Sequence, residues 1–442
     1  MLKAKNTLGL VFFPAFDWAI SDTHPEREER LLYTQDQIFE EGIQDIEGIK
    51  FFNPVIASEQ DIARVHFAVP DIASRVTPSH LVAAGGAIRA YQAVMNKEVD
   101  KAFALVRPPG HHAHRVVYGD KGFCIVNVGA VALEHIRHHY GDLRVAIVDT
   151  DVHHGDGTQD IYWNDPDTLL ISFHQDGRTL YPGTGRVEEF GGPAAYGYNI
   201  NIPLPPETGE EGFLHVLDNL VLPILEDFKP DLIINSAGQD NHYSDPLANM
   251  NFTAQGYAIL NERLNPDMAV LEGGYSIESA LPYINMGIIL AMAGLDYSQV
   301  FEPDYDAERL KQDPSITAYI EKISQDIYAL WKNKEALAEE KFKGKTEVKR
   351  EQQIYYDTAG VMEQQVQTFS ICAECAGVNR IDSQNDQGSH ILAITLPRKA
   401  CQACIDKAYA LYNAASTDNY SNVYLQDRVN DEYRARSRSL EA

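Results

Sequence analysis

Residues 144–158 read RVAIVDTDVHHGDGT, an apolar run that ends abruptly in a cluster of aspartates and histidines. The run is rich in valine and isoleucine and nearly continuous, which is typical of a parallel strand that is buried on both faces. The loop that follows it contains Asp149, Asp151, His153 and Asp156. On an extended segment, residues i and i+2 project to the same side, so Asp151 and His153 can share one metal ion.

Similar apolar runs recur as far as about residue 295. They are KAFALV (101–106), TLLISF (168–173), YNINIPL (198–204), DLIINSAG (231–238) and MAVLEGG (268–274). Segments with helical periodicity lie between several of them, notably residues 79–95 and 211–228. This alternation predicts an α/β fold with a doubly wound, mainly parallel sheet. In such folds the functional site lies at the carboxyl ends of the strands.

Two further polar loops follow apolar strands. The stretch RPPGHHA (107–113) carries His111 and His112, and SAGQDNH (236–242) carries Asp240. Asp240 would complete an Asp/His/Asp ligand set that leaves a coordination position open for water. That layout predicts a catalytic zinc site, although oxygen-rich ligands of this kind also suit Fe(II) or Mn(II).

The adjacent histidines indicate acid–base chemistry beside that metal. His111 and His112 are natural general acid and base groups for an activated water. Asp149 and Asp156 can orient the two imidazoles, because a histidine base needs a partner on its other ring nitrogen.

The order and spacing of these motifs resemble the histone deacetylase superfamily, which includes acetylpolyamine amidohydrolases and acetoin-utilisation proteins. The resemblance spans residues 8–295. It rests on HPEREERL (24–31), AAGGAIRA (83–90), RPPGHHA (107–113), GFC (122–124), DTDVHHGDGT (149–158), SFHQ (172–175), YPGTG (181–185), NIPLP (201–205), SAGQD (236–240) and LEGGY (271–275).

The resemblance implies an arginase/deacetylase-like fold and a role for each matching residue. The implied zinc ligands are Asp151, His153 and Asp240. The implied catalytic residues are the tandem His111 and His112, the carboxylates Asp149 and Asp156 behind them, and Tyr275, which donates a hydrogen bond to the acyl carbonyl. The implied substrate-binding residues are Gly122, Phe123 and Tyr181 along the channel and Asp71 at its rim.

The resemblance also implies bound potassium. The first monovalent-cation site matches Asp149, Asp151, His153, Ser172 and Phe173, partly through main-chain carbonyls. The second matches Tyr162, Asp165, Thr168 and Tyr198.

These residues predict a zinc-dependent amidohydrolase that removes acetyl or other acyl groups from lysine side chains of proteins or peptides. Metal-activated water, the tandem histidines and the Tyr275 oxyanion donor would perform the reaction. An acetylated polyamine is the alternative substrate, which the apolar Leu247 disfavours because polyamine-selective relatives can carry an acidic residue there.

Two hypotheses of a different kind remain. An arginase-like binuclear hydrolase is disfavoured by the His111–His112 pair and by Tyr275. A non-catalytic acyl-lysine binding module is disfavoured because every catalytic position is occupied.

The C-terminal part holds four cysteines in two C-x-x-C pairs: Cys372 with Cys375, and Cys401 with Cys404. Four thiolates make a closed tetrahedral site, so this pattern predicts a structural zinc ion, with redox chemistry as the alternative. A strand at 390–396 and a helix at 405–415 complete a zinc-ribbon or treble-clef-like domain. We assign this domain no catalysis and expect a docking role or homo-oligomerisation.

The chain therefore divides into three predicted parts. Residues 1–332 form the deacetylase domain, residues 333–354 a charged linker or helix, and residues 355–442 the small zinc-binding domain. Residues 333–442 carry 14 basic and 16 acidic side chains, so nearly all of the net charge of −27 lies on residues 1–332.

Composition narrows the partners and the location. A net charge of −27 over 442 residues repels phosphate backbones, so we expect no nucleic-acid partner. No run reaches the roughly 18 apolar residues of a membrane span, so we expect no membrane partner. The apolar segment 7–16 predicts a first buried strand and lacks a cleavage site. Together with the low cysteine content, this predicts a cytoplasmic protein.

Overall fold

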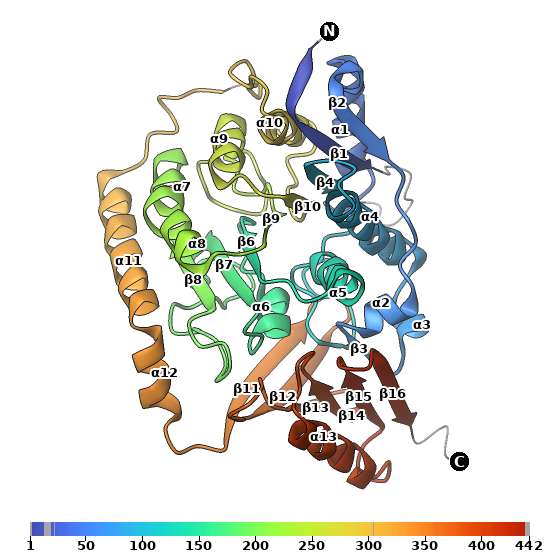
Figure 1. Cartoon of the computed structure of the whole chain (residues 1–442). Helices are drawn as coiled ribbons and strands as arrows, with labels where there is room; N and C mark the ends of the chain where they lie inside the picture. The colour runs from blue at the N-terminus through green and yellow to red at the C-terminus, as the bar shows by residue number, and fades with distance from the viewer. Residues whose placement is uncertain (1, 13–18, 22, 304, 438–442) are drawn as a thin grey trace.

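A computed structural model describes residues 2–12, 19–21, 23–303 and 305–437. Its largest element is a sheet of eight strands, all parallel (Figure 1). In sheet order the strands are β2 (Glu47–Phe52), β1 (Lys3–Phe12), β4 (Lys101–Leu105), β10 (Met268–Leu271), β9 (Leu232–Ala237), β6 (Val145–Asp149), β7 (Thr168–Gln175) and β8 (Asn199–Leu204). The predicted α/β fold is confirmed. Residues 13–16 of the predicted first strand lie outside the described residues.

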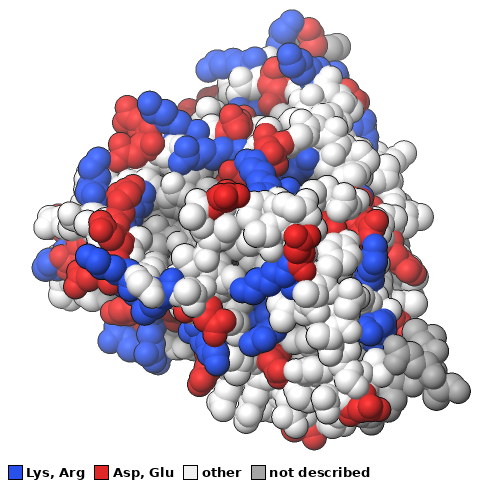
Figure 2. Space-filling view, turned by 60° about the horizontal axis from the view of Figure 1, so that its bottom comes forward, with Lys and Arg blue, Asp and Glu red and all other residues white. Residues whose placement is uncertain are grey.

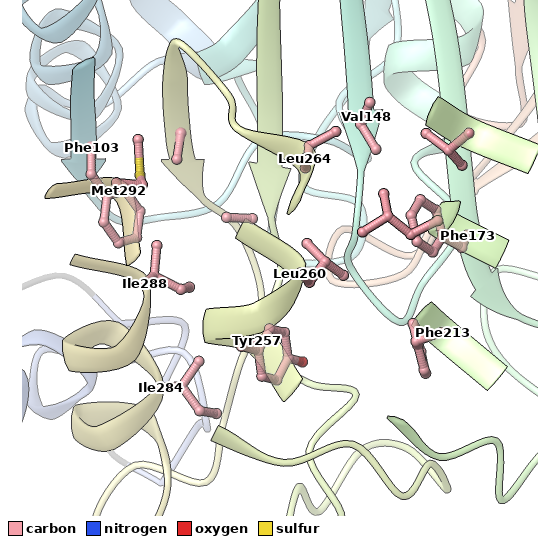
Figure 3. Close-up of a cluster of buried hydrophobic side chains, with 14 of the residues drawn as sticks. Phe103, Val148, Phe173, Phe213, Tyr257, Leu260, Leu264, Ile284, Ile288 and Met292 are labelled. Atoms are coloured by element: carbon pink, nitrogen blue, oxygen red, sulfur yellow. The ribbon is translucent and has the colours of Figure 1, made fainter. Parts of the chain in front are cut away.

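Alternate side chains of these strands enter two separate hydrophobic cores. On β4, Phe103 and Leu105 belong to one core, whereas Ala102 and Ala104 belong to the other. Both cores exclude water, which explains why the strands are continuously apolar in sequence. Figure 3 shows Phe103 of the first core, with Phe213 of α7 and Ile284 of α10.

Helices cover both faces of the sheet. The first core contains residues of α1 (Glu29–Glu40), α7 (Glu210–Val216), η2 (Leu217–Val221), α8 (Leu222–Phe228), α9 (Ala254–Leu264), α10 (Leu281–Ala293) and α11 (Pro314–Lys332). The second contains residues of α2 (Glu59–Ala63), α3 (Ile72–Arg75), α4 (Pro78–Met95), α5 (Val128–Tyr140) and α6 (Asp156–Tyr162). The segment 211–228 is predicted as one helix, but a π-helical turn at η2 separates α7 from α8.

The C-terminal part of the chain forms a second sheet, of six strands (Figure 1). Its strands follow chain order: β11 (Glu347–Tyr356), β12 (Val361–Ser370), β13 (Asn379–Asn385), β14 (His390–Leu396), β15 (Asn422–Asp427) and β16 (Glu432–Ser437). Helix α13 (Gln402–Ala414) packs on one face. The predicted strand 390–396 coincides with β14, and the predicted helix corresponds to α13.

The other face of the six-stranded sheet packs on the first part of the chain. Ile391 and Ala393 of β14 share a core with Phe67 of β3 (Phe67–Ala68) and Val116 of β5 (Val116–Val117). Arg398, after β14, extends this contact through ion pairs with Glu134 of α5, at 2.9 Å, and with Asp165, at 3.1 Å. The C-terminal sheet is thus joined to the α/β part by both apolar and charged contacts.

This C-terminal sheet is larger than a two-knuckle zinc ribbon requires. Residues 333–354, predicted as a linker or helix, form α12 (Lys334–Phe342) and most of β11. The sheet therefore begins before residue 355. The three-part division of the chain stays a prediction, as does assembly through this region.

Basic and acidic side chains are intermixed on the face of the molecule that lies at the bottom of Figure 1 (Figure 2). None of the described helices is long and apolar enough to cross a membrane.

Candidate active site

The polar loops converge because their strands are neighbours in the sheet. The order β4, β10, β9, β6 brings four carboxyl ends side by side. His111 and His112 follow β4, and Tyr275 follows β10. Asp240 follows β9, and the loop of Asp151 and His153 follows β6. Loops far apart in sequence thereby supply one site.

Asp151, His153 and Asp240 form a compact ligand set. Their donor atoms all lie within 4.8 Å of one another. His153 Nδ1 is 3.1 Å from Asp151 Oδ1 and 3.1 Å from Asp240 Oδ2, and both aspartates are fully buried. Two buried carboxylates need a positive partner, and this mixed oxygen and nitrogen set suits zinc.

Two glycines let the chain approach this set closely. A Cβ atom at Gly238 would lie 2.2 Å from Asp151 Oδ2, and one at Gly273 would lie 2.2 Å from Asp240 Oδ2. The main-chain N–H of Gly273 donates to Asp151 Oδ2 at 2.8 Å. A side chain at either position would displace a ligand carboxylate.

The tandem histidines each have the predicted carboxylate partner. His111 Nδ1 lies 3.0 Å from Asp149 Oδ2, and His112 Nδ1 lies 2.8 Å from Asp156 Oδ1. The Nε2 atoms are the ring nitrogens left for reacting groups, and His111 Nε2 lies 3.7 Å from Asp151 Oδ1. Burial, and then neighbouring His111, lowers the pKa of His112 to about 3.

Further groups that the sequence analysis missed hold this pair. Glu272 accepts the main-chain N–H groups of Gly110, at 2.7 Å, and of His111, at 3.1 Å. Lys121 donates to Asp156. Glu272 stands inside the LEGGY motif, but its position in the sequence does not distinguish it from a buried structural glutamate. Only its hydrogen bonds to Gly110 and His111 reveal that it supports the histidine pair.

A cavity of about 220 Å³ leads to the ligand set. It is lined by Pro109, His111, His112, Gly122, Phe123, Asp151, His153, Leu180, Tyr181, Leu247, Tyr275 and Asp357. The rings of Phe123 and Tyr275 meet edge to face at 5.6 Å, and those of His112 and Tyr181 at 5.2 Å. Gly122 has φ +52°, and a Cβ there would lie 2.4 Å from the His112 ring. The predicted channel residues Gly122, Phe123 and Tyr181 all line this cavity, and their contact with substrate stays a prediction.

Tyr275 is fixed by its main chain and by a neighbouring cation. Its N–H donates to Asp245 at 2.6 Å, and the Arg30 guanidinium lies 4.8 Å from the centre of its ring. Burial raises the pKa of the Tyr275 hydroxyl well above its usual value, so this group remains protonated and can donate.

Asp71 is not among the described residues that line the cavity, and its predicted rim role stays a prediction. Its carboxylate caps α3 by accepting the Ser74 N–H at 2.8 Å. Short sequence spacing cannot distinguish a rim aspartate from a helix cap, and the cap is the role seen here. The rim carboxylate that does line the cavity is Asp357, from the turn between β11 and β12.

The two predicted cation sites differ in how they are built. Asp149 pairs with Ser172 in the register of β6 and β7, beside Asp151, His153 and Phe173. At the second site, the Asp165 carboxylate contacts Arg137 at 3.2 Å and Arg398 at 3.1 Å, and Arg137 also donates to Thr168 at 2.9 Å. Any cation there would bind main-chain oxygens of Tyr162, Asp165, Thr168 and Tyr198, and both sites stay predictions.

The four cysteines meet at the end of the C-terminal sheet. Their sulfur atoms lie within 4.8 Å of one another. The N–H groups of Glu374 and Gly377 each point to a cysteine sulfur at 3.4 Å, as thiolate-binding knuckles require. Hydrogen bonds from Glu374 and Cys375 N–H groups lower the pKa of Cys372 to about 7, which favours the metal-binding thiolate. The arrangement can hold a metal and leaves no coordination position open.

Comparison with known proteins identifies the family. Residues 70–286 match the histone deacetylase domain. A probable deacetylase of Archaeoglobus fulgidus is 47% identical over 311 residues, which cover 64% of this chain and 85% of the relative. The chain belongs to the histone deacetylase family.

Other comparisons agree with this histone deacetylase assignment. The acetoin utilization protein AcuC of Bacillus subtilis is 31% identical, over 69% of this chain and 87% of the relative. The crystal structure of the HDA15 HD domain superposes with a TM-score of 0.64 at 26% identity, covering 77% of this chain and 99% of that one. The family consists of zinc-dependent hydrolases, so this chain is an enzyme. The family match ends before the four cysteines.

Removing a ligand at the Asp/His/Asp set should remove one metal and leave the fold intact. His153→Ala or Asp240→Ala is expected to reduce the zinc content by one ion per chain, because each deletes a direct donor. Metal analysis of purified protein measures this, with circular dichroism as the folding check. His138→Ala, which removes an imidazole exposed on α5, should keep the full content. An unchanged zinc content in a folded ligand variant would contradict the assignment.

Removing the cysteine site should have a different signature. Cys372→Ser combined with Cys401→Ser is expected to lose one zinc ion and to reduce thermal stability, because Cys404 of α13 lies in the core that this helix forms with the C-terminal sheet. Metal analysis and thermal unfolding test this. Cys124→Ala, which changes the cysteine outside the cluster, serves as the control for zinc content. Full zinc retention by the double variant would refute a four-thiolate site.

Proposed function

We propose that this enzyme hydrolyses the side-chain amide of acylated lysine in a protein or peptide. The supporting observation is that one narrow cavity is lined by two carboxylate-backed histidines, by Tyr275 and by Asp151 and His153, whose donor atoms lie within 4.8 Å of that of Asp240. Aromatic and glycine walls suit the aliphatic stem of lysine better than a bulky side chain. These features also disfavour a binding module, since binding alone requires no paired acid and base.

Catalysis would divide among the chain's own groups. When bound, zinc supplies a Lewis acid that acidifies water and polarises the scissile carbonyl. One imidazole of the His111–His112 pair would take a proton from water, and the other would give a proton to the leaving amine. Asp149 and Asp156 would hold both rings in a productive orientation.

Tyr275 would stabilise charge that develops on the carbonyl oxygen. A preformed donor of this kind is typically worth about 3–4 kcal/mol in the transition state. Packing against Phe123 and Arg30 restricts its ring, so little reorganisation would be needed when the oxyanion forms.

Leu247 supports a lysine substrate over an acetylated polyamine. It lines the cavity, and its apolar side chain offers no charge to a distal amine. Comparing the turnover of an acetyl-lysine peptide with that of an acetylated polyamine distinguishes these two substrates.

We also propose that a potassium ion binds at the site near Asp149 and Ser172, where its positive charge would offset the buried carboxylates.

Loss of the Tyr275 hydroxyl should reduce turnover without releasing metal. Tyr275→Phe is expected to lower kcat by about 100-fold or more, because one oxyanion donor is lost while every metal ligand remains. Steady-state kinetics on an acetyl-lysine peptide and metal analysis measure the two effects. Tyr305→Phe removes an exposed hydroxyl and serves as the control. Near wild-type kcat in Tyr275→Phe would refute the proposed role.

A further inference from the structure

The turn between β11 and β12 brings the C-terminal sheet to the mouth of the cavity. Asp357 in this turn is the one cavity-lining residue, among those the structure describes, that comes from beyond residue 332. The cavity has a clear depth, since Asp151 at its floor is fully buried whereas Tyr181 is 37% exposed. Asp357 is half-buried and interacts with Tyr181, which places it at the outer end.

The carboxylate of Asp357 is held in position from both sides. The Gly122 N–H lies 3.1 and 3.3 Å from its two oxygens, and the Thr358 N–H donates to Oδ1 at 2.8 Å. Behind the turn, the buried Tyr356 hydroxyl donates to Glu363 at 2.7 Å. It also lies 2.9 Å from the main-chain oxygen of Val116. The turn is thereby anchored to the same channel that Gly122 lines.

Asp357 retains capacity for another donor. A carboxylate has about four lone-pair sites, and the Gly122 N–H, the Thr358 N–H and the Tyr181 hydroxyl occupy three of them. The Thr358 hydroxyl, 3.3 Å from Asp357 Oδ1, can also donate to Asp120. The basic side chain near the cavity, Lys121, pairs with Asp156 instead. Apart from the metal ligand Asp151, Asp357 is the carboxylate among the described cavity-lining residues.

We propose that Asp357 is a specificity-determining residue that accepts a hydrogen bond from a substrate N–H located just beyond the acylated amine's aliphatic stem. This inference rests on the proposed amide hydrolysis in the cavity. The N–H group comes from the peptide main chain if the substrate is a protein, or from a distal ammonium if it is an acylated diamine. In either case the C-terminal sheet forms part of the substrate site.

Three substrates with the same five-carbon stem test this contact. An acetyl-lysine peptide offers main-chain N–H groups, N-acetyl-1,5-diaminopentane offers an ammonium, and N-pentylacetamide offers neither. Asp357→Asn keeps an acceptor for Gly122 but removes the charge, and Asp357→Ala removes both. Glu351→Gln makes the same charge change at an exposed position on β11 and is the matched control.

We expect Asp357→Asn to lower kcat/KM by about 10-fold, mainly through KM, for a substrate that carries the N–H donor. N-pentylacetamide should be hydrolysed as well as by the wild type, and Glu351→Gln should behave as wild type throughout. A loss confined to the peptide identifies a main-chain donor, and a loss confined to the diamine identifies an ammonium. Both results support the inference.

Two outcomes would overturn the inference. Equal losses on all three substrates would mean that Asp357 merely holds Gly122 and the channel wall. No loss on any substrate, in either Asp357 variant, would mean that the carboxylate makes no substrate contact. If the wild-type enzyme hydrolyses none of the three amides, the proposed function itself is contradicted.

Discussion

The burial of Asp151 and Asp240 against a single imidazole is the constraint around which the molecule is organised. Ionised carboxylates are costly to bury unless a positive partner compensates them. His153 cannot by itself neutralise both, and a metal ion can. The requirement explains why Gly238 and Gly273 approach so closely and why Val152 N–H and Gly273 N–H are directed at the two aspartates, at 2.9 and 2.8 Å.

The parallel sheet makes this concentration of charge tolerable. Its strands are covered on both faces by separate apolar cores, so their ends are rigid platforms for polar loops. Outside the metal ligands, acidic and imidazole side chains are hydrogen-bonded in succession. His112 contacts Asp156, and Asp156 contacts His114 at 3.2 Å. Nearby, the Asp160 carboxylate accepts hydrogen bonds from Gln352 and Gln367 of the C-terminal sheet, at 3.0 and 2.6 Å.

The core of the fold and the convergence of Asp151, His153 and Asp240 could be predicted because both leave local signals. Apolar runs mark buried strands, and Asp151-x-His153 stands immediately after one of them. Asp357 leaves no such signal, since a turn aspartate in a charged segment looks like any solvated residue until the sheet packs on β3 and β5. Asp71 illustrates the converse difficulty, because helix caps and substrate carboxylates share one sequence pattern. The π-turn at η2 likewise depends on packing that periodicity does not encode.

The hairpin turn at residues 357–360 also bears on how such an enzyme can diversify. Its tip is exposed, and a Cβ atom at Gly360, where φ is +64°, would meet no other atom within 4 Å. Changes in length or composition at this tip disturb neither hydrophobic core of the parallel sheet. Under the role proposed for Asp357, selection can alter substrate preference through this one small loop, without changing the residues at the strand ends that would perform the reaction.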